Sequence, residues 1–226
     1  MLGFQTAAHV VRLGRSAFFG DSKADLPIGR TSVLEADDLV PQFGFVGPKY
    51  EDLRVLVIGI NPAAGGTRTG ARTPADERMM PALHRFAEEP TERHFESASA
   101  AYERECRSWP RIWKRHCEKF VNEEFFDYES IAFVSCLPWR TGSGTAFSDA
   151  VARATARLYI RPLLDELSPR LIIAVSKRCR SILELAGLPR PRTITWNMSQ
   201  ASTEKATEER DVALREMRDW LQDARH

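Results

Sequence analysis

Residues 54–70 read RVLVIGINPAAGGTRTG, and this stretch decides the fold that we expect of the chain. Positions 55–58 are apolar and mostly β-branched, without alternating polar residues, which is typical of a strand covered on both faces in a parallel sheet. The run ends at Gly59, and Asn61-Pro62 opens a turn rich in glycine and threonine. Ligands of such sheets bind beyond the carboxyl ends of the strands. We therefore expect Asn61 at a binding site, although an ordinary turn uses the same residue types.

Strands and helices alternate along the rest of the chain. Apolar segments predict strands over 54–60, 130–135, 171–175 and 192–196. Helices are expected over 5–13, from Pro74, over 96–120 with a break at Pro110, from Phe147 or Ser148 to Leu167, from Ser176 to Leu185, and over 203–223. This alternation predicts an α/β fold, a three-layer α/β/α sandwich around a mainly parallel four-stranded sheet.

Length and composition favour one globular domain. The 226 residues can bury one substantial core, so we expect a single domain over 1–226, with 1–50 as an irregular arm packed on it. Hydrophobic content of 43% and charged content of 28% are typical of soluble proteins. No apolar run approaches the ~18 residues that cross a bilayer. The N-terminus lacks the order of a signal peptide, so we expect a cytoplasmic protein without a membrane partner.

Cysteine spacing and charge limit the other classes of site. The four cysteines are widely spaced, which argues against a zinc site, an iron–sulfur cluster and a disulfide framework, so we expect no metal and no cofactor. The net charge of +1 excludes neither nucleic acids nor small substrates, because a balanced total can conceal a basic face. Basic residues are locally dense at Arg68, Arg72, Arg140, Lys177, Arg178, Arg180, Arg190 and Arg192.

Two short motifs resemble those of the uracil-DNA glycosylase superfamily. Gly59-Ile60-Asn61-Pro62, followed by Thr69-Gly70, resembles the first motif of its mismatch-specific and thymine-DNA branches. Residues 197–202, NMSQAS, are similar to the closing motif, which begins His-Pro-Ser or Asn-Pro-Ser in different branches. The resemblance spans residues 50–205 and implies a uracil-DNA glycosylase-like domain that repairs DNA by base excision, flipping the damaged base out of the helix.

The resemblance also implies a role for individual residues. Asn61 would position the attacking water through its side-chain carbonyl, and Asn197 would donate a hydrogen bond to the leaving base. Ser199 matches the serine that contacts a DNA phosphate, although it could also cap the final helix. The other expected DNA contacts are Gln200, Ser202, Arg68 and Arg140. The expected substrate contacts are Gly59, Ile60, Pro62, Gly70, Phe133, Ser135, Cys136 and Tyr50.

The chain departs from the family's pattern in both motifs. Met198 replaces a proline, and Ala201 stands where a bulky wedge would fill the gap left by a flipped base. Extruding a base costs least from a single strand, so we expect activity on single-stranded DNA at least equal to that on duplex. Thr73 replaces the usual base-stacking aromatic residue, and Ser135 replaces the base-reading asparagine. The candidate replacement platforms are Phe45, Tyr50, Phe133 and Trp139.

Three functions stay open at this stage. The first is a monomeric, monofunctional hydrolase that releases uracil from single- or double-stranded DNA. The second is a non-catalytic or differently specialised relative that binds nucleic acid or a partner, which the missing stacking residue and the altered closing motif favour. The third is a hydrolase of small nucleosides or nucleotides. The sequence has no Gly-x-Ser-x-Gly elbow, Walker loop or His-Glu-x-x-His motif that would favour another chemistry.

Overall fold

A five-stranded sheet forms the centre of the computed structural model, which describes residues 2–20, 39–60, 74–108, 118–122, 124–139, 148–187, 192–196 and 204–225. The strands are β1 (Phe45–Val46), β2 (Val55–Gly59), β3 (Ile131–Ser135), β4 (Leu171–Ala174) and β5 (Arg192–Thr195), in the spatial order β1-β3-β2-β4-β5. β2 to β5 are parallel, and β1 runs antiparallel to β3. The fold class is α/β, as predicted, and all four predicted strands are present.

The expected four-stranded sheet is corrected by the edge strand β1. Phe45 pairs with Phe133 and Val46 with Ala132, so the sheet has five strands and mixed direction. With only two residues, β1 is too short to produce a periodic pattern in the sequence. The segment 1–50 is also more regular than expected, because its described part contains two helices besides this strand.

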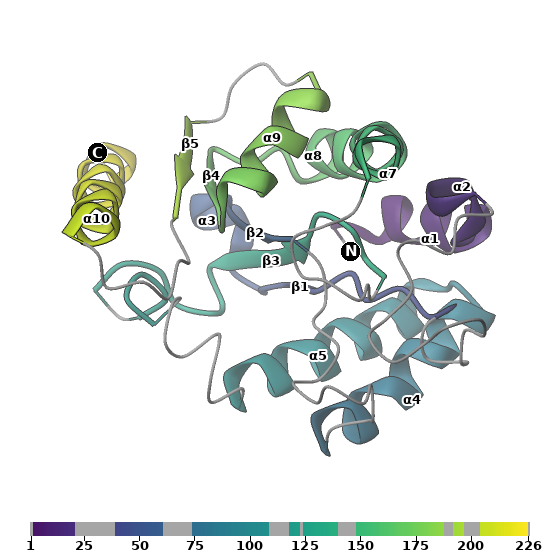
Figure 1. Cartoon of the computed structure of the whole chain (residues 1–226). Coiled ribbons are helices and arrows are strands. Elements are labelled where there is room, and N and C mark those ends of the chain that lie inside the picture. Colours follow the sequence, from purple (N-terminus) through teal and green to yellow (C-terminus); the bar gives the residue numbers. More distant parts are fainter. Residues whose placement is uncertain are drawn as a thin grey trace.

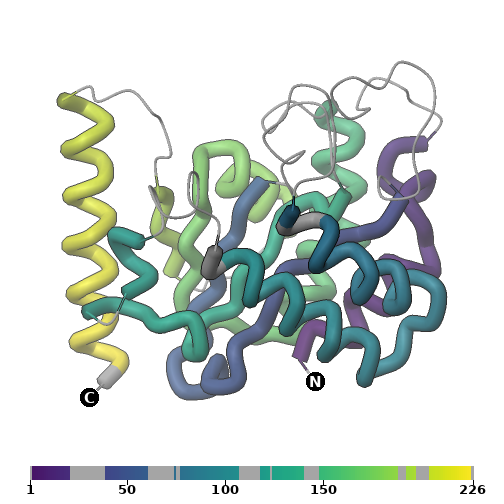
Figure 2. Tube along the Cα trace, turned by 90° about the horizontal axis from the view of Figure 1, so that it is seen from below, coloured from purple at the N-terminus to yellow at the C-terminus, as the bar shows by residue number. Residues whose placement is uncertain are grey.

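Helices cover both faces of the sheet (Figure 1). One face carries α4 (Pro74–Glu88) and α5 (Glu92–Ser108), which lie side by side in Figure 2. The other face carries α1 (Phe4–Leu13), α2 (Ser16–Phe19), α7 (Asp149–Thr155), the π-helix η2 (Ala156–Ile160), α8 (Arg161–Leu167) and α9 (Lys177–Leu185). The short helix α3 (Tyr50–Leu53) leads into β2, and α10 (Glu204–Arg225) lies beyond β5 (Figure 1). In the described parts of the chain, no helix is both long and apolar enough to cross a membrane.

Side-chain caps set the helix starts that the sequence predicts. The Ser148 hydroxyl accepts a hydrogen bond from the Val151 amide, and the Ser176 hydroxyl accepts one from the Cys179 amide. Each cap satisfies an amide that has no partner within its helix. Gly187, at φ 69°, lies just past the end of α9, as a terminating glycine should.

The strands are buried from both sides, as the unbroken apolar run predicts. Residues 55–58 of β2 and 171–174 of β4 have no exposed surface. Alternate residues meet different helix layers, because side chains along a strand point to opposite faces. Phe133 stacks against Tyr102 of α5, whereas Val134 faces Tyr159 of η2. By the same alternation, Ser135 lies on the α5 side of the sheet, and the next residue, Cys136, lies on the other side.

Candidate functional site

The four parallel strands end at one edge of the sheet. Gly59 is the register partner of Ser135, while Ile58 and Thr195 flank Ala174. Pairing continues past the strands, since the Leu137 amide donates to the Ile60 carbonyl (2.9 Å) and the Trp196 amide donates to the Ala174 carbonyl (2.8 Å). In open α/β sheets this edge is where ligands bind, so it is the candidate site.

Most of the predicted site residues follow directly from this edge but lie outside the described residues. They are Asn61, Pro62, Arg68, Gly70, Arg140, Asn197, Ser199, Gln200 and Ser202. The structure does place the residues that precede the two asparagines: Ile60 directly after β2 and Trp196 directly after β5. Only β4 separates those strands, so the two points are two strand spacings apart, roughly 10 Å.

Gly59, Phe133 and Ser135 meet on the α5 side of this edge. A Cβ atom at Gly59 would lie 3.5 Å from Cζ of Phe133, so the glycine leaves the end of that ring without a side chain over it. Phe133 is 8% exposed. Its ring centroid lies 6.3 Å from that of Tyr102 and 6.2 Å from that of Phe45. Ser135 is 2% exposed and is the register partner of Gly59. These three residues form a small, nearly buried apolar cluster with one hydroxyl group.

Cys136 contributes less to this edge than expected. Its amide donates to the Gly59 carbonyl at 2.7 Å, so that amide is not available to a ligand. Its thiol is fully buried on the opposite face of the sheet from Ser135, close to the thiol of Cys179. Cys136 therefore supports the end of β2 rather than contacting a base.

All four candidate aromatic platforms are buried core residues, and Phe133 keeps the largest exposed fraction of them, 8%. Tyr50 belongs to α3, at the opposite end of β2, and its buried hydroxyl donates to the Leu167 carbonyl (3.3 Å). Burial raises the pKa of the Tyr50 hydroxyl. Trp139 packs on the ring of Phe18 at 4.7 Å, and Phe45 is 1% exposed. The structure does not bring Tyr50 to the candidate site.

Basic residues lie at the start of α9, next to the end of β4. Lys177 is 78% exposed and pairs with Glu209 of α10 at 3.5 Å. Arg178 pairs with Asp149, and Arg180 donates to Glu184 and to the Thr195 hydroxyl of β5. The positive end of the helix dipole lies at the same place, and each of the three basic side chains is paired with a carboxylate. Sequence reasoning noted these residues as locally dense charge without assigning them to the site.

An ion pair between an exposed arginine and a buried glutamate fixes the start of α4, just after the segment that begins at Asn61. Nη2 of Arg78 lies 2.6 Å from Oε2 of Glu105, and Nε of the same guanidinium contacts both carboxylate oxygens. The Glu105 side chain is 2% exposed. The hydrogen bonds from Arg78 lower the pKa of Glu105. This pair ties the first turns of α4 to the end of α5.

The ion pair predicts a pH dependence of stability. A carboxylate whose pKa is lowered by folding stabilises the fold above its ordinary value of 4.5 and loses that contribution as the pH falls through the folded value. We expect Glu105→Gln to unfold at lower denaturant concentration than wild type at neutral pH, with the difference shrinking on acidification. Denaturation midpoints across acidic pH, with the exposed Glu96→Gln on the same helix as control, measure this. An equal deficit at every pH would contradict it.

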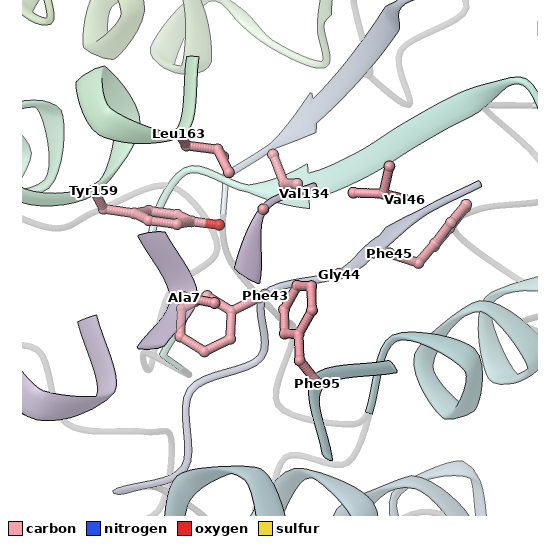
Figure 3. A pocket seen from close by; sticks show the side chains of 10 residues that line it. Ala7, Phe43, Gly44, Phe45, Val46, Phe95, Val134, Tyr159 and Leu163 are labelled. Atoms are coloured by element: carbon pink, nitrogen blue, oxygen red, sulfur yellow. The ribbon is translucent and has the colours of Figure 1, made fainter. Parts of the chain in front are cut away.

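The cavity in Figure 3 is not this site. It lies beside the edge strand β1 and is lined by Ala7, Phe43, Phe95, Val134, Tyr159 and Leu163, among others. Its volume of about 10 Å³ is the room that one water molecule needs, far less than a nucleobase. Burial raises the pKa of the Tyr159 hydroxyl, and no described residue forms a hydrogen bond with it.

Comparison with known proteins does not assign the chain to a family. No family model matches the chain, and no curated protein sequence matches it. Within the described residues, no group of three or more His, Cys, Asp or Glu side chains is placed to hold a metal ion.

Proposed function

We propose that the chain is a DNA glycosylase that hydrolyses the N-glycosidic bond of uracil in DNA. One observation carries the proposal: the residues directly before Asn61 and Asn197 end two strands of one sheet edge with a single strand between them. Two motifs that resemble those of uracil-DNA glycosylases therefore start from the same side of the molecule. Gly59, Phe133 and Ser135 lie on that edge as well.

In the proposed reaction the two asparagines have different roles. The bond from C1′ to the base breaks, its electron pair leaves with uracil, and the sugar becomes a cation. Asn61 holds a water molecule against C1′ through its side-chain oxygen, and the Asn197 amide donates to the oxygen on which the charge of the leaving base develops. The sugar cation is electrophilic enough that its water needs little deprotonation, so an amide suffices where other enzymes use a carboxylate.

The base itself is placed on the surface next to Gly59. Phe133 is the aromatic candidate that reaches this edge, and base–aromatic stacking contributes roughly 1–3 kcal/mol. The Ser135 hydroxyl makes one hydrogen bond to the pyrimidine, which is less selective than the two that an asparagine amide would make. The start of α9, with Lys177 and Arg178, faces the phosphates.

Adding a methyl group to Gly59 tests the base platform. Gly59→Ala places its Cβ at ordinary contact distance from Phe133, so we expect stability close to that of wild type. The methyl covers the ring end, and loss of part of the stacking should lower kcat/KM for uracil release about tenfold. The denaturation midpoint of Gly59→Ala, measured beside its activity, separates loss of stacking from loss of folding. Unchanged activity in a folded Gly59→Ala protein would remove Phe133 from the proposal.

Reversing one charge tests the phosphate contact. Lys177→Glu is expected to weaken binding of single-stranded DNA and to lower the slope of log Kd against log salt concentration by roughly 0.7, the value of one lost phosphate contact. Lys49→Glu, which reverses a lysine near the other end of β2, should leave that slope unchanged. Equal slopes for wild type and Lys177→Glu would show that DNA does not pass over the start of α9.

The activity is tested with three substrates. The chain is incubated with a single-stranded oligonucleotide containing one deoxyuridine, with the same strand in duplex, and with free deoxyuridine, and abasic sites are detected by alkaline cleavage. We expect cleavage of both DNAs, with the single strand at least as fast as the duplex because Ala201 supplies no wedge. DNA binding without abasic sites would support the binding protein instead, and release of base from the nucleoside alone would support a nucleoside hydrolase.

A further inference from the structure

Two cysteines lie close together beneath the end of β2. Cys136 follows β3 and Cys179 lies in the first turn of α9, and both are fully buried. The two thiol groups lie close enough that each shifts the pKa of the other. The two residues are far apart in sequence, and the sheet brings them together because β3 and β4 flank β2.

Backbone hydrogen bonds fix both cysteines to the same strand end. The Cys136 amide donates to the Gly59 carbonyl at 2.7 Å on one side of β2. The Val175 amide donates to the Ile58 carbonyl at 2.9 Å on the other side, and α9 begins two residues later. The positions of both cysteines therefore depend on the position of the end of β2, the strand that precedes Asn61.

The surroundings of the two thiols shift their pKa values in opposite directions. The Ser176 hydroxyl donates to the Cys179 sulfur at 3.3 Å, and the Cys179 amide donates back to that hydroxyl at 3.2 Å. Burial would raise the pKa of Cys179, but the hydrogen bonds from the Cys136 thiol, the Ser176 hydroxyl and backbone amides lower it. Burial raises the pKa of Cys136. These directions favour Cys179 as the more acidic thiol of the pair.

We propose that Cys136 and Cys179 are a dithiol that a small peroxide oxidises to an intrachain disulfide, linking the end of β3 to the start of α9 across β2. The Cys179 thiolate attacks one oxygen of hydrogen peroxide, the O–O bond breaks, and the departing hydroxide takes a proton to become water. The Cys136 sulfur then attacks the resulting sulfenic acid, and its proton leaves with the hydroxyl group as a second water. Two thiols lose two electrons, which reduce one peroxide to two waters.

The disulfide needs only a short approach of the two groups. A disulfide requires about 2.05 Å between sulfurs, less than two unbonded thiol groups have, so the first turn of α9 must move toward the sheet. Ser176, which is half-buried, covers Cys179 from the edge of the sheet. Cys106 is the internal comparison, because it is also buried but belongs to α5 on the other face. The proposal does not depend on the activity proposed above.

Peptide mapping tests the proposal on the full chain. The native protein is treated with hydrogen peroxide, denatured in N-ethylmaleimide and digested without reductant by a protease that cuts after lysine, which places Cys106, Cys136 and Cys179 in peptides 50–114, 120–177 and 178–205. We expect peptides 120–177 and 178–205 to be joined, with the mass of two hydrogens lost, while peptide 50–114 carries the alkyl group. The link should be absent from Cys136→Ser and Cys179→Ser and present in Cys106→Ser.

The wild-type map decides the matter even if a serine variant does not fold. Two alkylated peptides after peroxide treatment, or a link from either peptide to another cysteine, would overturn the proposal. A melting temperature that rises by several degrees on oxidation, and returns on reduction with dithiothreitol, is the expected second result, because a disulfide restricts the unfolded chain. A melting temperature that falls on oxidation would contradict a link compatible with this fold.

Discussion

Replacing Gly44 with alanine is expected to destabilise the chain more than any other glycine-to-alanine change considered above. The added Cβ would lie 1.9 Å from the carbonyl oxygen of Phe133 and 3.0 Å from Cα of Val134, so the backbone that leads into β1 must move away from β3. Gly44 also has φ of 94°, a conformation that side chains rarely adopt. Overpacking and the backbone term together should lower the free energy of unfolding by roughly 2–5 kcal/mol.

Urea denaturation of three proteins measures this effect. Gly14→Ala has a similar positive φ of 70° but meets no atom within 4 Å, so its loss isolates the backbone term, about 1–2 kcal/mol. The difference between the two variants then gives the cost of separating β1 from β3. Equal losses of unfolding free energy in Gly44→Ala and Gly14→Ala would show that moving β1 away from β3 costs no stability.

The second large effect is expected at Asn61. Removing the side chain that holds the water, in Asn61→Ala, should lower kcat for uracil release by about 10²-fold, the low end of the range for groups that assist proton transfer. The rate of base release from a single-stranded deoxyuridine oligonucleotide under single-turnover conditions measures it. The unfolding midpoint should stay within error, since the change removes no residue of the described core.

A conservative replacement supplies the matched control for Asn61. Asn61→Asp keeps the shape of the side chain and provides a carboxylate, which holds the same water and is a stronger base. We expect this variant to retain wild-type activity or exceed it. Equal loss in Asn61→Asp and Asn61→Ala would place Asn61 in a structural role at the turn instead of against the water.

Regular segments of this fold were predictable because their signals are local. The unbroken apolar run at 55–58 predicts a strand buried on both faces, and that strand lies at the centre of the sheet. Ser148 and Ser176 act as the expected caps, because capping depends on the two or three residues that follow. β1 escaped prediction because its two residues are stabilised by pairing with distant β3.

The site was predictable to the extent that it follows strand ends. Strand direction places Gly59 and Ser135 at one edge, and the structure pairs them. Tyr50 is an aromatic residue close in sequence to the first motif, but it precedes β2, so it lies one strand length away at the opposite edge. The contact between Cys136 and Cys179 depends on the spatial order β3-β2-β4, which no local pattern in the sequence encodes.

The most direct test is a crystal structure of the chain with uracil bound. We predict the pyrimidine ring at the carboxyl edge of the sheet, next to Gly59 and Phe133, with the side chains of Asn61 and Asn197 on opposite sides of it. Uracil bound elsewhere, or the two asparagines in separate places with no shared cavity between them, would contradict the proposed glycosylase.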